Sequence, residues 1–357
     1  RDSVISWRPI KWKDLTEEHA TKEVLEGSNL CILGIAGVGK THFAKQLVEQ
    51  LRALGKKVDV IAKCHIAAVR AGGVTADHFV RRTILHGACT ADVILVEEIS
   101  QIECALWTML NKVNKQWILC GDWNQFAPVH NSWRGNTIPS GAFESSRMFH
   151  RLSDGNRLTL TKCRRSDSFL FDFYSSLILG GVRFHMPLSE VLEEARSLFH
   201  FEGHARHNLC ISHVKRRKLN REINIALRPE GAILIRAKPE KGQTNTAQNM
   251  FIWPGIELIG ATAAVRRGIR NNCMYEVMSL DQDGVHVRHE EEAPIKLTYE
   301  QVASWLRLSF GRTYASIQGT EFSESVRLHD TTNKHFTMKH LFVALSRAKD
   351  KNKIDIA

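Results

Sequence analysis

The sequence contains no long hydrophobic run, and this absence narrows what the chain can be. No apolar stretch approaches the roughly 20 residues that a membrane-spanning helix needs. The polar start, Arg1–Lys13, has no signal-peptide core. The eight cysteines include no CxxC pair, and several, such as Cys31 and Cys120, lie within apolar runs. We therefore expect buried free thiols in an intracellular, reducing compartment, not disulfides or zinc ligands.

Internal repeats and low-complexity segments are also absent. The 357 residues, 43 % of them hydrophobic, have an ordinary globular composition. This length is enough for two domains of roughly 150 residues each. The net charge of +11 suits an anionic partner such as nucleic acid, and it equally suits a generic basic surface.

Short apolar runs alternate with helical patterns along the chain, which predicts α/β domains with parallel sheets. In the first half we expect strands at Leu30–Leu33, Val58–Ala62, Val93–Val96 and Trp117–Cys120, and helices at Lys40–Leu54 and Cys104–Val113. In the second half we expect a helix at Ser168–Leu179, strands at Leu209–His213, Ala232–Arg236, Ile256–Ile259, Tyr275–Met278, Val285–Val287 and Ser325–His329, and a helix at Met338–Ala348. The simplest division is a first domain at residues 1–170 and a second at 171–357.

Residues 34–41, GIAGVGKT, fit the phosphate-binding pattern GxxxxGK[ST] in full. They follow an apolar strand and precede a helical pattern, which is the context that the motif requires. Gly34, Gly37 and Gly39 let backbone N–H groups curl round phosphates, and the helix N-terminus adds positive potential. We expect Lys40 to reach the β- and γ-phosphates and the Thr41 hydroxyl to ligate Mg²⁺.

Two further strands end in polar side chains that suit hydrolysis of a nucleotide. Glu97 and Glu98 directly follow Val93–Val96, where a Mg²⁺ ion and an attacking water need carboxylates. We expect Glu97 to hold the metal through water and Glu98 to polarise the nucleophilic water. Gln125, shortly after Trp117–Cys120, is a candidate to hydrogen-bond the γ-phosphate and that water.

Beyond the phosphate loop, six segments resemble, in order, the motifs of superfamily 1 DNA helicases of the Pif/RecD-like group. The resemblance runs from about Leu15 to Ala348, nearly the whole chain. The segments are 62–79 (AKCHIAA followed by GGVTADHF), 97–100 (EEIS), 121–129 (GDWNQFAPV), 143–167 (FES followed by LTKCRRSD), 313–322 (TYASIQGTEF) and 342–348 (FVALSRA).

The resemblance implies two RecA-like domains that clamp ATP between them and walk along single-stranded DNA, typically 5′→3′. Carried over by position, Arg165 and Arg347 are the arginines that reach the γ-phosphate, with Arg164 as a competitor of Arg165. Such arginines stabilise the charge of phosphoryl transfer. The resemblance also implies that residues of the second domain line the nucleotide, namely Gln318, Gly319 and Glu321.

The same resemblance implies a DNA path across the tops of both domains, with backbone phosphates meeting N–H groups and hydroxyls. The candidate contacts are His65, Thr75, His78, His213 and Ser316. The run Lys215–Lys218 is typical of a solvated helix face and also suits phosphate. Single-stranded DNA and a forked duplex are the expected partners, in DNA replication or repair.

Four departures from the family pattern stand out. Glu97 replaces an Asp at the Mg²⁺ site, and His19 stands where the family has an adenine-reading Gln. Ala315 and Ser316 replace a His-Lys pair. The family's inserts look reduced, to residues 130–141 in the first domain and roughly 281–297 in the second.

Three functions stay open on the sequence: a DNA helicase or translocase, which we favour, an RNA helicase of the viral superfamily 1 type, and a nucleotide-dependent nucleic-acid-binding module with little hydrolysis. The start without Met and the end shortly after Ala348 suggest a helicase domain from a larger polypeptide. The nucleus and a viral replication site both remain open as locations.

Overall fold

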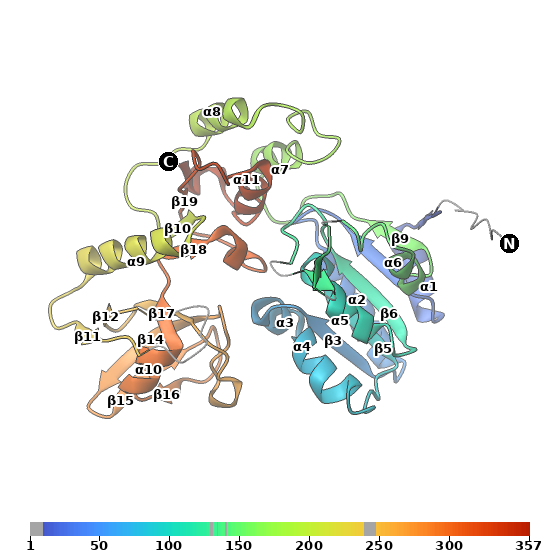
Figure 1. Cartoon of the computed structure of the whole chain (residues 1–357), viewed down its shortest axis with the longest axis horizontal. Helices are drawn as coiled ribbons and strands as arrows, with labels where there is room; N and C mark the ends of the chain where they lie inside the picture. The colour runs from blue at the N-terminus through green and yellow to red at the C-terminus, as the bar shows by residue number, and fades with distance from the viewer. Residues whose placement is uncertain (1–9, 129–130, 134, 140, 239–247) are drawn as a thin grey trace. The chain divides into compact units, whose positions relative to one another are not determined.

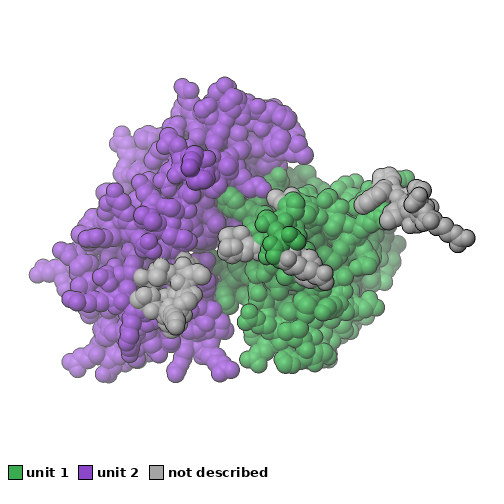
Figure 2. Space-filling view, in the orientation of Figure 1, with its two compact units in different colours: residues 1–165 green, residues 166–357 purple. Residues whose placement is uncertain are grey.

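The computed structural model describes residues 10–128, 131–133, 135–139, 141–238 and 248–357. The chain divides into two compact units, Arg1–Arg165 and Ser166–Ala357, which Figure 2 shows in two colours. Each unit contains a parallel sheet with helices, so the expected α/β class is confirmed.

The first unit is built on a seven-stranded parallel sheet in the order β1-β9-β2-β6-β5-β3-β4 (Figure 1). Its strands are β1 (Lys13–Asp14), β2 (Leu30–Leu33), β3 (Val58–Ala62), β4 (Val74–Thr75), β5 (Val93–Glu97), β6 (Gln116–Gly121) and β9 (Asn156–Thr159). Its helices are α1 (Glu17–Leu25), α2 (Lys40–Ala53), α3 (His65–Ala71), α4 (Ala76–Phe79), the π-helix η1 (Val80–Ile84), the 3₁₀ turn η2 (Ile99–Gln101), α5 (Cys104–Leu110) and α6 (Arg147–Leu152). The four strands expected here match β2, β3, β5 and β6 to within one residue at each end.

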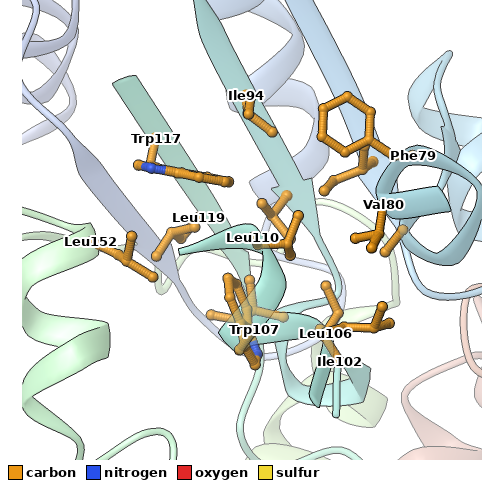
Figure 3. Close-up of a cluster of buried hydrophobic side chains, with 14 of the residues drawn as sticks. Phe79, Val80, Ile94, Ile102, Leu106, Trp107, Leu110, Trp117, Leu119 and Leu152 are labelled. Carbon is orange, nitrogen blue, oxygen red and sulfur yellow. The ribbon is translucent and has the colours of Figure 1, made fainter. Parts of the chain in front are cut away.

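The central strands read as continuous apolar runs because parallel strands are covered on both faces. On one face, Ile94, Leu119 and Trp117 pack with the α5 residues Leu106 and Trp107 (Figure 3). The Trp107 ring is fully buried and stacks on Phe143, with 4.3 Å between ring centroids. Cys31 on β2 and Cys120 on β6 are free and buried, as expected, and burial raises the pKa of both thiols.

The expected insert at residues 130–141 contains a short antiparallel hairpin, β7 (Ser132–Trp133) with β8 (Asn136–Thr137). Asn131 anchors its base, because the Asn131 side chain accepts a hydrogen bond from the Cys104 N–H at 3.0 Å. His130, Arg134 and Ser140 of this insert lie outside the described residues.

The second unit has a four-stranded parallel sheet in the order β18-β10-β19-β20. The strands are β10 (His207–Cys210), β18 (Gly311–Thr313), β19 (Val326–Leu328) and β20 (Ile354–Ile356). The helices are α7 (Ser168–Ser175), α8 (Leu188–Leu198), α9 (His213–Leu227), the 3₁₀ turn η4 (Tyr314–Ile317), α11 (Met338–Leu345) and the 3₁₀ turn η5 (Lys351–Lys353). The expected strand Leu209–His213 was wrong at its end: β10 stops at Cys210, and His213 opens α9 because the Ser212 hydroxyl caps that helix.

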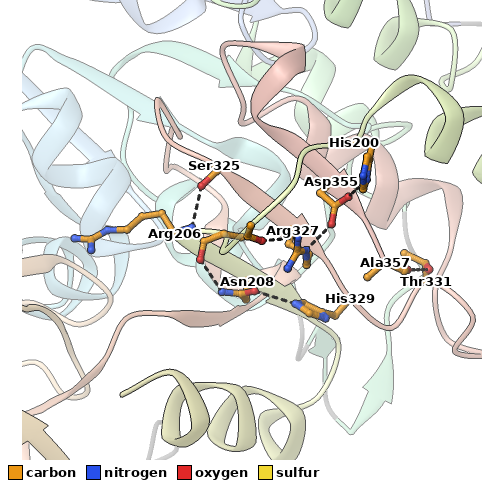
Figure 4. A network of polar contacts seen from close by, with 11 residues as sticks. His200, Arg206, Asn208, Ser325, Arg327, His329, Thr331, Asp355 and Ala357 are labelled. Atoms are coloured by element: carbon orange, nitrogen blue, oxygen red, sulfur yellow. Dashed lines mark hydrogen bonds and ion pairs between the residues drawn. The ribbon is translucent and has the colours of Figure 1, made fainter. Parts of the chain in front are cut away.

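Polar side chains fix the parallel strands of this sheet to one another (Figure 4). The Asn208 side chain on β10 donates to Ala205 O and contacts the His329 ring at 2.9 Å. Asp355 on β20 accepts from Arg327 on β19 and contacts His200 at 2.8 Å. Buried polar groups are tolerated when they are paired in this way.

Between α9 and β18 the chain forms antiparallel structure. β11 (Ile233–Ile235) pairs with β12 (Met250–Ile252). A five-stranded sheet follows in the order β16-β15-β14-β13-β17, with β13 (Glu257–Gly260), the 3₁₀ turn η3 (Val265–Arg267), β14 (Met274–Asp281), β15 (Gly284–Arg288), β16 (Ile295–Leu297), helix α10 (Tyr299–Trp305) and β17 (Leu306–Leu308).

This sheet is larger than the insert expected at residues 281–297, which forms only its β15–β16 part. The strands expected at Ile256–Ile259 and Tyr275–Met278 exist, but they belong to the antiparallel sheet. A short apolar run does not distinguish a strand of a parallel sheet from one of a compact antiparallel sheet, which is why the sequence understated the insert.

Candidate nucleotide and nucleic-acid site

The phosphate loop leaves β2, turns through three glycines with positive φ and enters α2. Gly34, Gly37 and Gly39 have φ of 152°, 89° and 92°. Gly34 also allows a close approach, because a Cβ there would lie 2.4 Å from the carbonyl oxygen of Leu160. In this loop the Lys40 ammonium donates to Ile35 O at 2.9 Å, so the side chain folds back over the turn where phosphates bind in this motif.

The carboxylates lie at the same edge of the sheet as the phosphate loop. β6 pairs with both β2 and β5, so the C-terminal ends of all three strands meet there. The Thr41 hydroxyl donates to the Glu97 carboxylate at 3.4 Å. Sequence positions far apart are therefore brought together as the strand–loop pattern predicted.

Glu97 and Glu98 differ in environment. Glu97 is buried, and desolvation together with the neighbouring Glu98 charge raises its pKa to about 7. Glu98 adopts a left-handed conformation, φ 53°, which is strained for a non-glycine residue. Each carboxylate has one buried oxygen without a hydrogen-bond partner, Glu97 Oε1 and Glu98 Oε2. Unsatisfied carboxylate oxygens beside the Thr41 hydroxyl fit the oxygen-ligand preference of Mg²⁺.

Gln125 is buried in the turn that follows β6. Its amide nitrogen donates to the Asp122 carboxylate at 3.4 Å, while its Oε1 has no hydrogen-bond partner. Gly121 permits this turn to pack closely, since a Cβ there would lie 2.5 Å from Ile99. The free amide oxygen can accept a hydrogen bond, as the expected contact with an attacking water requires.

Arg164 covers the phosphate loop. Its backbone N–H donates to Gly37 O at 2.8 Å. A Cβ at Gly39 would lie 2.8 Å from the Arg164 Cδ, so the side chain runs directly over that glycine. Arg165, which the sequence favoured as the arginine for the γ-phosphate, is half-buried next to it. Sequence reasoning identified the pair but had no signal for which member contacts the loop.

His19, the residue in place of the adenine-reading Gln, is exposed in the first turn of α1. Its Nδ1 lies 3.0 Å from the hydroxyl of Thr16, the helix cap. The neighbouring Glu17 lies 4.0 Å from the Arg164 guanidinium, which places this turn beside the phosphate loop.

The nucleotide candidates of the second unit come from two adjoining segments. The Phe322 N–H donates to Arg347 O at 2.8 Å, and Lys349 lies 3.9 Å from Glu321. Gln318 is buried at the end of η4, and Gly319 turns with φ 82°. Arg347 is also buried, and its Nε and Nη2 have no hydrogen-bond partner. The structure thus brings Gln318, Gly319, Glu321 and Arg347 into one region of the second unit.

The nucleic-acid candidates of the first unit lie at the C-terminal ends of β3 and β4 or directly after them, at the sheet edge that carries the phosphate loop. His65 opens α3. The Thr75 hydroxyl caps α4 by accepting from the His78 N–H at 3.3 Å. The Lys63 ammonium connects α4 with the start of α5, because it forms ion pairs with Asp77 at 2.9 Å and with Glu103 at 2.7 Å. The Thr75 hydroxyl thus already has a structural role.

In the second unit, His213 is exposed at the start of α9. The Ser316 hydroxyl donates to Thr313 O at 2.9 Å, and its carbonyl accepts from the Arg312 guanidinium at 3.0 Å. Sequence reasoning missed three buried arginines near these residues: Arg216, Arg307 and Arg312. Burial of Arg216 could have been predicted, because Arg216, Asn220 and Asn224 are four residues apart and so share one face of α9. The surrounding basic residues suggested a solvated face instead.

Across the residues that the structure covers, no helix has both the length and the apolar character to cross a membrane.

Comparison with known proteins agrees with this geometry. A family model described as an AAA domain matches residues 17–157. The ATP-dependent DNA helicase PIF1 of Candida albicans is 27 % identical over 144 residues, which cover 32 % of this chain and 16 % of that protein. The human protein of the same name is 28 % identical over 171 residues, 38 % of this chain and 25 % of the relative. The matched part is thus a quarter or less of these relatives' length.

Solved structures extend the likeness to the second unit. The crystal structure of Pif1 helicase from Candida albicans has a TM-score of 0.71 at 19 % identity, covering 96 % of this chain and 94 % of that one. Bacteroides Pif1 bound to single-stranded DNA has a TM-score of 0.71 at 18 % identity, with 96 % and 92 % covered. At these identities the likeness establishes the fold, two RecA-like units. The chain is thus similar to the Pif1 helicases in sequence over part of its first unit, and in fold over nearly its whole length.

Proposed function

We propose that the chain is an ATP-dependent DNA helicase or translocase that couples ATP hydrolysis to movement along single-stranded DNA. The observation that carries this proposal is the convergence of Lys40, Thr41, Glu97, Glu98 and Gln125 at one edge of the first sheet. The homologous helicases named ATP-dependent, and the Bacteroides relative bound to single-stranded DNA, support it.

In this proposal the residues of the first unit carry out hydrolysis. Lys40 leaves Ile35 O and neutralises the β- and γ-phosphates, while the loop N–H groups hold them. Thr41, and Glu97 through a water, would hold Mg²⁺, which would neutralise charge on the phosphates when bound. Glu98 accepts the proton of the attacking water, and the unpartnered Gln125 oxygen orients that water.

Arginines from both units contribute to hydrolysis. Arg165, the last residue of the first unit, and Arg347 of the second unit stabilise the charge on the transferring phosphoryl group, and Gln318, Gly319 and Glu321 line the nucleotide. Arg347 suits this role because its guanidinium has two donors without partners. Hydrolysis of the bound ATP would then drive movement along the DNA.

His65, Thr75, His78, His213 and Ser316 are the proposed DNA contacts. Because the Thr75 and Ser316 hydroxyls are already bonded to the backbone, we assign their contribution to the neighbouring N–H groups at the start of α4 and to the η4 turn. We propose 5′→3′ movement from the family resemblance, and a forked duplex as a substrate, since two cooperating Pif1 helicases unwind forked DNA.

The test is an ATPase assay with and without single-stranded DNA, followed by unwinding of duplexes with a 5′ or a 3′ tail. We expect DNA to stimulate hydrolysis, Lys40→Ala to abolish it, and Lys45→Ala, an exposed position on the same helix, to retain it. Stimulation by RNA in place of DNA would favour the RNA-helicase alternative. Nucleic-acid binding without turnover would favour a binding module, and no response to any nucleic acid would refute the motor.

A further inference from the structure

The second unit carries a basic turn at its surface, between β13 and β14. Residues 262–272, TAAVRRGIRNN, contain three arginines and no acidic residue. At the tip, which is the 3₁₀ turn η3, Arg266 and Arg267 are exposed, and Val265 is 54 % exposed. The tip therefore presents an apolar side chain to solvent next to two positive charges.

The charges of Arg266 and Arg267 are not neutralised by carboxylates. Among the described residues, neither side chain forms an ion pair. The third arginine of the turn, Arg270, is neutralised, because its Nη1 donates to both carboxylate oxygens of Glu292, at 2.9 and 3.1 Å. The preceding acids, Glu290–Glu291, are exposed and form no ion pair in the described part of the chain. Two positive charges thus stay available to an anionic partner.

The turn is anchored to the antiparallel sheet by a buried hydroxyl. Tyr275 on β14 is 0 % exposed, and its hydroxyl donates to Gly268 O at 2.9 Å and accepts from the Arg270 N–H at 2.7 Å. An antiparallel bridge between Ala264 and Ile269 closes the turn, and Gly268 supplies the positive φ of 79° that the reversal needs. An exposed tip that is already ordered loses little conformational entropy when it binds a partner.

We propose that this turn binds the end of a nucleic-acid duplex, with Val265 against the outermost base pair and Arg266 and Arg267 on backbone phosphates. Guanidinium groups suit phosphate oxygens because their N–H groups match that geometry. Sites for single strands stack bases on aromatic rings, and the tip has no aromatic residue. Aliphatic side chains beside basic ones are instead typical of contacts that press on the base steps of a duplex.

The turn would act in strand separation, a step beyond movement along a single strand. This assignment rests on the proposed function, because a motor on one strand is what brings a duplex end to the protein. The contact itself rests on the exposed charges and the anchored tip. Hydrolysis stimulated by a single strand should therefore not need Val265, Arg266 or Arg267, whereas unwinding should need all three.

The test is a double variant, Arg266→Ala with Arg267→Ala, compared on a forked duplex and on a single strand equal to one of its tails. For the fork we expect roughly tenfold weaker binding, as for the loss of charged hydrogen bonds. The slope of log affinity against log salt should fall by roughly 1.8 for two phosphates of a duplex. Single-strand affinity and single-strand-stimulated ATPase should stay unchanged, while the unwinding rate falls.

Four further variants separate the charges from the apolar tip and from net charge. Arg266→Lys with Arg267→Lys should recover part of the fork affinity. Arg221→Ala with Arg236→Ala removes two exposed charges elsewhere in the second unit and should change neither fork binding nor unwinding. Val265→Ser should lower the unwinding rate more than the fork affinity, and Val265→Ile should retain both. Because the changed side chains are exposed, we expect the Tm of each variant to equal that of the unaltered chain.

The remaining outcomes decide against the proposal or against the function on which it rests. Equal losses on the fork and on the single strand would make the turn a single-strand contact and overturn the duplex assignment. Unchanged fork binding and unwinding in the double alanine variant would show that the turn binds no nucleic acid. If a single strand neither binds nor stimulates ATPase while fork binding still depends on Arg266 and Arg267, the proposed function fails and the duplex contact stands.

Discussion

The backbone N–H of Arg164 donates to the carbonyl oxygen of Gly37, in the middle of the phosphate loop. Four residues earlier, the Leu160 N–H donates to Leu33 O at 2.8 Å, so the segment after β9 follows the loop along its length. We therefore expect a change in the loop on nucleotide binding to be felt at Arg164 and at its neighbour Arg165.

The two arginines should differ in their kinetic effect. We expect Arg165→Ala to lower kcat roughly 10³-fold with little change in KM, because an arginine that contacts the transferring phosphoryl group acts in the transition state. Arg164→Ala should mainly change KM, since its side chain covers Gly39 before catalysis. Steady-state ATPase kinetics of both variants decide the assignment, and the reverse pattern would transfer the role to Arg164.

Gly34→Ala should disrupt the loop more than an equivalent change elsewhere. The new Cβ would meet Leu160 O at 2.4 Å, in addition to the strain of positive φ. Gly55, with φ 78° and open space around its Cβ position, isolates the strain alone. We expect Gly55→Ala to cost about 1 kcal/mol of unfolding free energy and Gly34→Ala clearly more. Urea unfolding measures both free energies. An equal loss of stability in the two variants would show that the Leu160 backbone moves aside at little cost and would contradict the prediction.

Glu97→Gln should weaken the response to Mg²⁺. The change keeps the shape of the side chain and removes its charge beside Thr41, so the Mg²⁺ concentration for half-maximal ATPase should rise roughly 10- to 100-fold. Glu97→Asp restores the acid that the family pattern has here and should stay close to the unaltered chain. If Glu97→Gln titrates like the unaltered chain, Glu97 is not a metal contact.

Acid should destabilise the second unit through His207. Burial and the charges of Arg312 and Arg206 lower the pKa of this ring to about 3, despite Glu324 at 3.7 Å. The unfolded chain binds the proton from about pH 6.5 downward, whereas the folded chain binds it only near pH 3, so stability is complete above pH 6.5 and falls toward pH 3. The loss approaches about 1.4 kcal/mol per pH unit.

The check is the Tm of the chain between pH 7 and pH 4. His207→Gln should flatten this dependence, while His204→Gln, at an exposed position three residues earlier, should not. Parallel curves for the unaltered chain and His207→Gln would contradict the prediction.

A feature of the structure could be predicted from the sequence when its signal lay within one short segment. The first sheet was predictable because a buried parallel strand is a continuous apolar run, and because GIAGVGKT fixes what precedes and follows it. Glu97 and Thr41 could be paired in advance, since both follow strands that end at one edge. The start of α9 was misread, because Leu209–His213 looks like one apolar run until the Ser212 cap is considered.

Contacts between distant segments could not be read in this way. The local sequence around Arg164 does not indicate that its N–H donates to Gly37 O, because that hydrogen bond depends on the pairing of β9 with β2. Likewise the Asn220 side chain on α9 donates to Leu308 O at the end of β17, at 3.4 Å, only because the antiparallel sheet between α9 and β18 folds back on that helix. Burial of a charged residue is a tertiary property that composition and periodicity do not encode.

The antiparallel sheet has a further consequence for how such chains diversify. Its last strand, β17, ends at Leu308, and the parallel sheet resumes with β18 at Gly311. The outer strand β16 pairs only through β15, so lengthening or trimming at the β14–β15 turn leaves the register of β18 on β10 untouched. This antiparallel module can therefore change in size at its tip without any change in the parallel sheet of the second unit.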